Sequence, residues 1–171
     1  MLESMSDDTH GLSKSTWTHH DFDHMGWHDA QLHAIAMEFA DDGEAPGWWL
    51  LLDLDYIVRW VEPRHPDTHF TFWTAPATLV FHDAFNVRFS GGIERMDLVE
   101  ILDLHRSPVA ARLSGDPSWD WHVEGDGFDL RVDATGFTQY FRREPIHVPR
   151  QELTLAERGG ISVSRRAFDG A

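Results

Sequence analysis

The chain has 171 residues, of which 42% are hydrophobic and 25% are charged. This composition is typical of a single globular domain and excludes a disordered or fibrous chain. Because there is no cysteine, a disulfide framework, a cysteine-ligated metal centre and a thiol nucleophile are excluded. The 29 acidic residues outnumber the 14 basic ones, and the formal charge of −15 disfavours nucleic-acid binding, since such a surface repels phosphate.

The charge is uneven along the chain. Residues 1–62 contain 13 acidic and two basic side chains, whereas residues 142–171 contain four acidic side chains and six arginines. We expect these arginines to bind an acidic surface, and the N-terminal half of the same chain is the preferred one. The excess of carboxylates also has a simpler explanation, which is that it keeps the protein dissolved and monomeric.

Three segments are expected from polarity. Residues 1–20 have few apolar side chains and predict a flexible N-terminal arm. Residues 21–149 form a single β-rich domain, and residues 150–171 form a C-terminal tail that either wraps the domain or hangs free. Residues 1–14 lack an export signal, and the longest apolar run, 48–52, is far shorter than the roughly 20 residues needed to cross a bilayer. We therefore expect a cytoplasmic protein without membrane contact.

The N-terminal half predicts strands joined by a turn. Residues 31–39 admit a strand or a short helix, and the turn-forming residues 41–47 after them favour a strand with a tight connection to its neighbour. The pattern is clearest over residues 48–61, where apolar and charged side chains alternate. One row contains Leu52, Leu54, Tyr56, Val58 and Trp60, and the other contains Asp53, Asp55 and Arg59. This alternation predicts a half-buried strand.

The rest of the chain predicts further short strands, with no βαβ rhythm. The extended segments are 69–74, 77–81, 86–90, 99–106, 119–123, 128–132 and 137–141. Ala75-Pro76 separates the first two, residues 99–106 also admit a helical turn, and Gly125-Asp126-Gly127 predicts a hairpin turn. About eight short strands with little helix predict a mostly β fold, an antiparallel β-sandwich or a half-open barrel.

Two adjacent tryptophans suggest a contact surface. Neighbouring residues of a strand face opposite ways, so either Trp48 or Trp49 lies on the second face of the sheet, where it lines a cleft or a contact surface. Acidic side chains close to them in sequence add charge to this aromatic anchor. The expected partner-binding residues are Asp41, Asp42, Trp48, Trp49, Asp53 and Asp55.

A second set of residues suggests a metal site. His24 and His28 have the i, i+4 spacing that presents two imidazoles on one helical face, and Asp29 is a ligand or second acceptor beside them. Gly26 weakens a helix there, however, and surface histidines explain the same pattern.

Asp53 and Asp55 share a strand face, with attachment points about 6.6 Å apart. In a pocket, such a pair divides acid and base roles or holds Mg²⁺ or Ca²⁺. On a solvated face it has no such role, and one of the two carboxylates then pairs with Arg59.

Three stretches carry a resemblance to a known group of proteins. They are Trp27-His28-Asp29 with His33, Leu52-Asp53-Leu54-Asp55-Tyr56-Ile57 with Trp60, and Pro76-Ala77-Thr78-Leu79-Val80-Phe81. Over about residues 22–140 the chain resembles small β-rich bacterial proteins of uncharacterised function, some of which are thought to be immunity-type partners of toxins. The resemblance implies a stand-alone antiparallel β domain and transfers no catalytic residue.

Three functions are compatible with these observations. The first is a non-enzymatic acidic binding domain, an inhibitor or immunity-like protein whose charge steers it to a basic protein partner, with no cofactor. The second is a metal-assisted hydrolase that uses His24, His28, Asp29 and the Asp53/Asp55 pair. The third is a carrier of a small apolar ligand, because a half-barrel rich in aromatic residues can enclose one.

Overall fold

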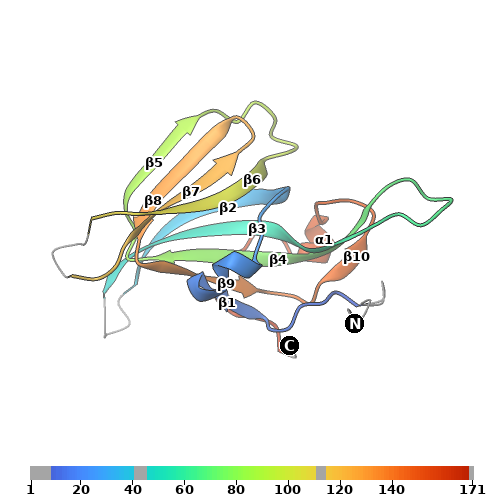
Figure 1. Cartoon of the computed structure of the whole chain (residues 1–171), viewed down its shortest axis with the longest axis horizontal. Coiled ribbons are helices and arrows are strands. Elements are labelled where there is room, and N and C mark those ends of the chain that lie inside the picture. The colour runs from blue at the N-terminus through green and yellow to red at the C-terminus, as the bar shows by residue number, and fades with distance from the viewer. Residues whose placement is uncertain (1–8, 41–45, 111–114, 170–171) are drawn as a thin grey trace.

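The computed structural model describes residues 9–40, 46–110 and 115–169. Ten strands and two short helices form this part of the chain (Figure 1). The strands are β1 (Thr16–Thr18), β2 (Ala30–Ala40), β3 (Gly47–Val61), β4 (Thr71–His82), β5 (Phe85–Gly91), β6 (Glu100–Pro108), β7 (Trp119–Gly125), β8 (Phe128–Ala134), β9 (Gly136–Phe141) and β10 (Ile146–Val148). The helices are the 3₁₀ helix η1 (His19–His24) and α1 (Leu155–Arg158). No helix in the described ranges is long and apolar enough to span a membrane.

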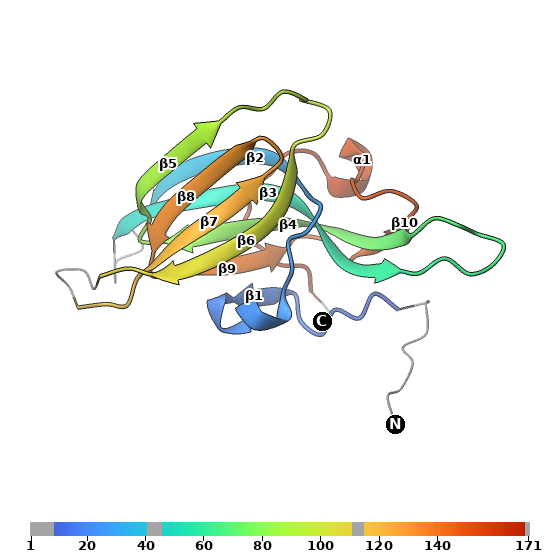
Figure 2. The ribbon, with the colours of Figure 1, turned by 45° about the horizontal axis from the view of Figure 1, so that its top comes forward.

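The strands form one antiparallel sheet that does not close into a barrel. Their order is β1-β9-β4-β3-β2-β6-β7-β8-β5, and β10 pairs with β4 off this path. Figure 2 shows that the path ends at β1 on one side and at β5 on the other. The structure confirms the mostly β, antiparallel fold with little helix, with ten strands where about eight were expected.

The sheet bends so that its two parts face each other across the core. The bend lies where β2 meets β6, which pair only through Ala30 and Gln31. Beyond it, the part formed by β5 to β8 lies over the part formed by β3, β4 and β9 (Figure 1). The ring of Trp121 on β7 lies 5.9 Å from that of Phe81 on β4 and 5.2 Å from that of Phe137 on β9. Aromatic packing therefore joins the two parts.

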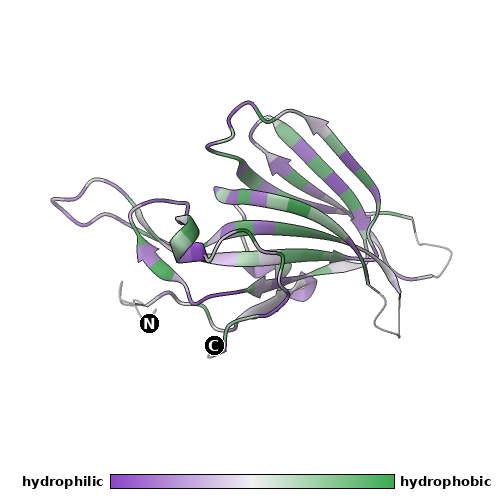
Figure 3. Cartoon of the chain, turned by 180° about the vertical axis from the view of Figure 1, so that it is seen from behind, coloured by the Kyte–Doolittle hydropathy of each residue, from purple (hydrophilic) through white to green (hydrophobic). Residues whose placement is uncertain are grey.

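The strands follow the expected alternation, which Figure 3 shows as alternating colours along β5 to β8. The exception is β3, whose residues 50–57 are all buried, the charged ones included. Both faces of this strand are therefore covered, which corrects the expectation of a half-buried strand with a solvated charged row.

A proline in the middle of the sheet corrects the prediction of two separate strands. β4 is continuous from Thr71 to His82 and passes through Pro76. On the outer side of β4, the pairing with β10 ends at Thr74 and the pairing with β9 begins at Ala77. Pro76 lies in the gap between them, where its missing N–H group leaves no ladder bond unmade.

Both ends of the described chain pack onto the sheet. Leu12 is buried, and β1 pairs with β9, so the expected flexible arm is corrected for residues 9–20, while residues 1–8 lie outside the described residues. The C-terminal segment (residues 150–169) crosses the outer face of β2, β3 and β4 and belongs to the same domain. Its helix α1 begins with a capping box between Thr154 and Glu157 and ends at Gly159, whose φ of 77° suits glycine.

Candidate functional site

Asp53 and Asp55 lie in the interior, not on a contact surface. Both side chains are fully buried under the C-terminal segment. This burial corrects the expectation that they form part of an exposed partner-binding surface, and it also corrects the alternative of a solvated face with an ion pair to Arg59. Their location follows from the strand parity that the sequence predicts, because the odd-numbered row of β3 faces the side that residues 150–169 cover.

Arginines neutralise the two buried carboxylates. Asp53 accepts hydrogen bonds from Arg142 (2.6 Å) and from two nitrogens of Arg158 (2.7 and 3.1 Å). Asp55 accepts from Nε of the same arginine at 3.1 Å. The side chain of Arg158 is itself fully buried. Two negative charges are thus paired with two positive ones, as a low-dielectric interior requires.

Three further contacts complete the pairing. The backbone N–H groups of Leu153 and Ser162 donate to Asp55 and Asp53 at 2.9 and 2.8 Å. A ring nitrogen of His33 on β2 lies 2.9 Å from Asp55. We call these side chains, Asp53, Asp55, Arg142, Arg158 and His33, the buried charge cluster. It confirms that C-terminal arginines bind the acidic N-terminal half of the same chain, and every carboxylate oxygen in it has a partner.

The two adjacent tryptophans face opposite ways, as predicted. Trp49 shares the outer face with the buried charge cluster, and the guanidinium of Arg165 lies 4.5 Å from its ring centroid. Trp48 lies on the inner face and is 57% exposed. Its ring meets that of Phe39 edge-on at 5.5 Å. Of the pair, Trp48 is therefore the one available to a partner.

Trp48 belongs to a larger exposed apolar surface. Ile35, Met37 and Phe39 of β2 pair with Leu52, Leu50 and Trp48 of β3, so all these side chains lie on the inner face. Leu50 and Leu52 are buried, but the exposed fractions are 42% for Ile35, 69% for Met37 and 51% for Phe39. We call Ile35, Met37, Phe39 and Trp48 the β2–β3 apolar patch.

The edge of β2 beside this patch is open. β2 pairs with β6 through Ala30 and Gln31, and the N–H of Leu32 donates to Val99 at 2.7 Å. For residues 33–40 no strand pairs with β2 on this side in the described part of the chain, although β3 pairs with them on the other. An open edge presents unpaired N–H and C=O groups to a partner.

The residues expected to bind metal do not converge. His24 ends η1, while His28 lies 3.4 Å from Asp29. Asp29 accepts a hydrogen bond from Gln151 of the C-terminal segment at 2.7 Å. Within residues 9–40, 46–110 and 115–169, no three His, Asp or Glu side chains are grouped as a metal site. The remaining expected residues, Asp41 and Asp42, lie outside the described residues.

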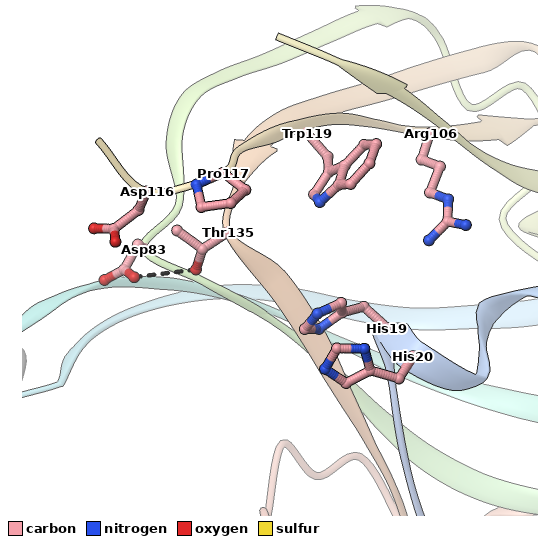
Figure 4. A pocket seen from close by; sticks show the side chains of 8 residues that line it. All are labelled: His19, His20, Asp83, Arg106, Asp116, Pro117, Trp119 and Thr135. Carbon is pink, nitrogen blue, oxygen red and sulfur yellow. Dashed lines mark hydrogen bonds between the residues drawn. The ribbon is translucent and has the colours of Figure 1, made fainter. Parts of the chain in front are cut away.

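A polar pocket of about 720 Å³ lies beside η1 (Figure 4). The histidine pair His19 and His20 lines one side, with ring centroids 4.1 Å apart. Figure 4 shows Trp119 and Arg106 across from this pair, and Pro117, Asp116, Thr135 and Asp83 toward the other end. Sequence reasoning did not find this pocket, because its residues come from five separate segments and no local spacing joins them.

The pocket alters the titration of one histidine. Burial lowers the pKa of His19 below its ordinary value, and the nearby His20 and Arg106 lower it further, against an opposing backbone hydrogen bond at Phe137. Burial likewise lowers the pKa of His82, whose charge is felt by His19. Both imidazoles therefore favour the neutral form more than a free histidine does.

Comparison of the chain with family models, with curated proteins and with solved structures gave no match. Three features thus define the candidate sites. They are the β2–β3 apolar patch with its open strand edge, the polar pocket beside η1, and the buried charge cluster, whose contacts are all internal to the fold.

Replacing Arg158 tests the buried charge cluster. Arg158→Met leaves Asp55 without its arginine and Asp53 with Arg142 alone, so we expect a loss of about 3–5 kcal/mol in the free energy of unfolding. Arg166→Met, on an exposed arginine of the same segment, is the matched control and changes it by less than about 0.5 kcal/mol. Urea unfolding measures both, and equal effects contradict the assigned role of Arg158.

Replacing His20 tests the geometry of the pocket. His20→Gln removes a neighbouring positive charge, so we expect the pKa of His19 to rise toward its ordinary value. A histidine titration followed by NMR measures this shift. His24→Gln, at the other end of η1, is the control and leaves the pKa of His19 unchanged; a His19 pKa that is the same in all three proteins contradicts the observed stacking.

Proposed function

We propose that this protein is a protein-binding domain that takes an extended segment of a basic partner as an added strand beside β2. The observation that carries the proposal is the coincidence of an open strand edge with the β2–β3 apolar patch. The backbone of the partner pairs with residues 33–40, and its apolar side chains cover Ile35, Met37, Phe39 and Trp48. This mode of recognition combines main-chain hydrogen bonds with side-chain specificity.

The patch has the composition of a contact surface. Four large apolar side chains lie together on one face, each more than two-fifths exposed. A group of this kind is costly to leave in water, since each side chain gains about 1.5–3 kcal/mol on full burial. Trp48 supplies the aromatic anchor that dominates many interfaces. Covering the patch therefore gives a driving force for binding.

The edge of β2 lacks the protection that the other two edges have. β1 has only three residues, and β5 has an irregularity between Phe85 and Arg88 as well as the charge of Arg88. Short strands, bulges and inserted charges are the usual means of blocking edge pairing. Residues 33–40 of β2 contain no proline or lysine, and Glu38 is the one carboxylate. This edge is therefore suited to receive a strand.

The charge of the chain selects a basic occupant. A second copy of the chain would bring together two proteins of formal charge −15, and their repulsion opposes such a dimer. A basic segment is instead attracted at long range and associates faster. Glu38 projects from the face of β2 opposite Met37 and Phe39, so basic side chains that alternate with apolar ones fit the two faces.

An inhibitor or immunity-like role is one form of this proposal. The resemblance of residues 22–140 to small β-rich bacterial proteins, some of them immunity-type, agrees with a domain whose task is to bind another protein. In that role the partner is a basic toxin, and its extended segment becomes unavailable once it pairs with β2.

A labelled peptide tests the proposal. We use a peptide of about eight residues in which valine and lysine alternate, matching the length of the open edge, and measure binding by fluorescence anisotropy. Binding should weaken as salt rises from about 50 to about 200 mM. Trp48→Ser should weaken it about tenfold or more, because an aromatic anchor is lost.

Two controls separate strand addition from general attraction. Leu155→Ser replaces an exposed apolar residue on α1, outside the patch, and should leave binding unchanged. N-methylation of alternate peptide amides blocks pairing on one side of the peptide only, so one of the two methylated forms should bind and the other should not. Equal binding of both forms, or an equal effect of Leu155→Ser and Trp48→Ser, overturns the proposal.

A further inference from the structure

The polar pocket beside η1 has two ends of opposite charge. Figure 4 shows His19, His20 and Arg106 at one end and the carboxylates of Asp83 and Asp116 at the other. This separation of charge within one cavity suits a ligand that is itself charged at both ends.

The basic end is held in place by aromatic packing. The guanidinium of Arg106 lies 4.5 Å from the ring centroid of Phe22 and 5.2 Å from that of Trp119. Its carboxylate contact, with Asp23, is long at 3.4 Å and exposed. A guanidinium fixed by rings retains N–H donors in a planar array that matches an anionic oxygen group.

The histidine pair adds to this end and is also fixed. A Cβ atom at position 136 would lie 2.3 Å from Nδ1 of His19, so the close approach of this ring depends on Gly136. His20 stacks on His19 from within η1. Each imidazole can donate an N–H to an anion or become cationic next to it.

The acidic end is joined to the same wall. Thr135, the neighbour of Gly136, donates a hydrogen bond to Asp83 at 3.1 Å. Asp116 lines the pocket beside Pro117. These carboxylates favour an ammonium group, and they repel a ligand that carries only negative charge.

We propose that this pocket binds a small zwitterion, with its carboxylate or phosphate oxygens at Arg106, His19 and His20 and its ammonium group at Asp83 and Asp116. A simple anion is disfavoured, because the formal charge of the chain is −15 and repels it at long range. A zwitterion has no net charge to repel, and both of its ends are paired. The volume of about 720 Å³ is within the range of small-molecule sites.

NMR titration of the indole N–H of Trp119 and the ring signals of His19 and His20 tests this proposal. The probes are 4-aminobutanoate for a carboxylate, phosphoethanolamine for a phosphate, and butanoate and butylamine as partners with one charge. We expect at least one zwitterion to give saturable shifts at millimolar concentration and to bind about tenfold more tightly than either singly charged probe. The better zwitterion identifies the anionic group.

Matched variants locate the binding. Arg106→Gln and Asp116→Asn, one at each end, should each weaken the zwitterion about tenfold. His24→Gln on η1 and Trp48→Ser on the β2–β3 apolar patch should leave its binding unchanged, so this site is tested independently of the peptide-binding proposal. The absence of saturable shifts with either zwitterion, or equal affinity in Arg106→Gln and the unmodified protein, overturns the proposal.

Discussion

The pairing of Asp53 and Asp55 with Arg142 and Arg158 is the interaction on which the rest of this structure depends. A strand with charged side chains on one face is normally solvated on that face, but here the face lies in the interior. Two arginines make this burial tolerable, since an unpaired carboxylate in the interior costs several kcal/mol. The cluster fixes the C-terminal segment on the outer face and turns β3 into a strand covered on both sides.

The period of the sequence predicted the strands but not what covers them. Alternation over residues 48–61 separates the Leu52 row from the Asp53 row, and this separation is correct. It contains no information on whether water or another segment of the chain lies over each row, because residues 150–169 approach from about 100 positions away. The predicted pairing of C-terminal arginines with the acidic half was correct because charge balance, unlike periodicity, operates between distant segments.

The candidate sites show the same limit in two ways. Ile35, Met37 and Phe39 follow a pattern that indicates the inner face, and they do lie on it, but the second part of the sheet does not extend over them. Alternation therefore cannot distinguish a buried inner face from an exposed one. The pocket beside η1 was missed because its residues come together through the bend of the sheet. Its clearest sequence signal, the pair His19-His20, lies in a stretch whose polarity suggested a flexible arm.

The position of Arg158 in the chain has a consequence for biosynthesis. A ribosome makes Asp53 more than a hundred residues before this arginine, so the nascent sheet spends most of translation with its acidic row hydrated. Contacts of such large sequence separation form late and slowly. The outer layer can close only after the last arginine emerges, and a chaperone that shields β3 during this interval would act on the stage most exposed to misassembly.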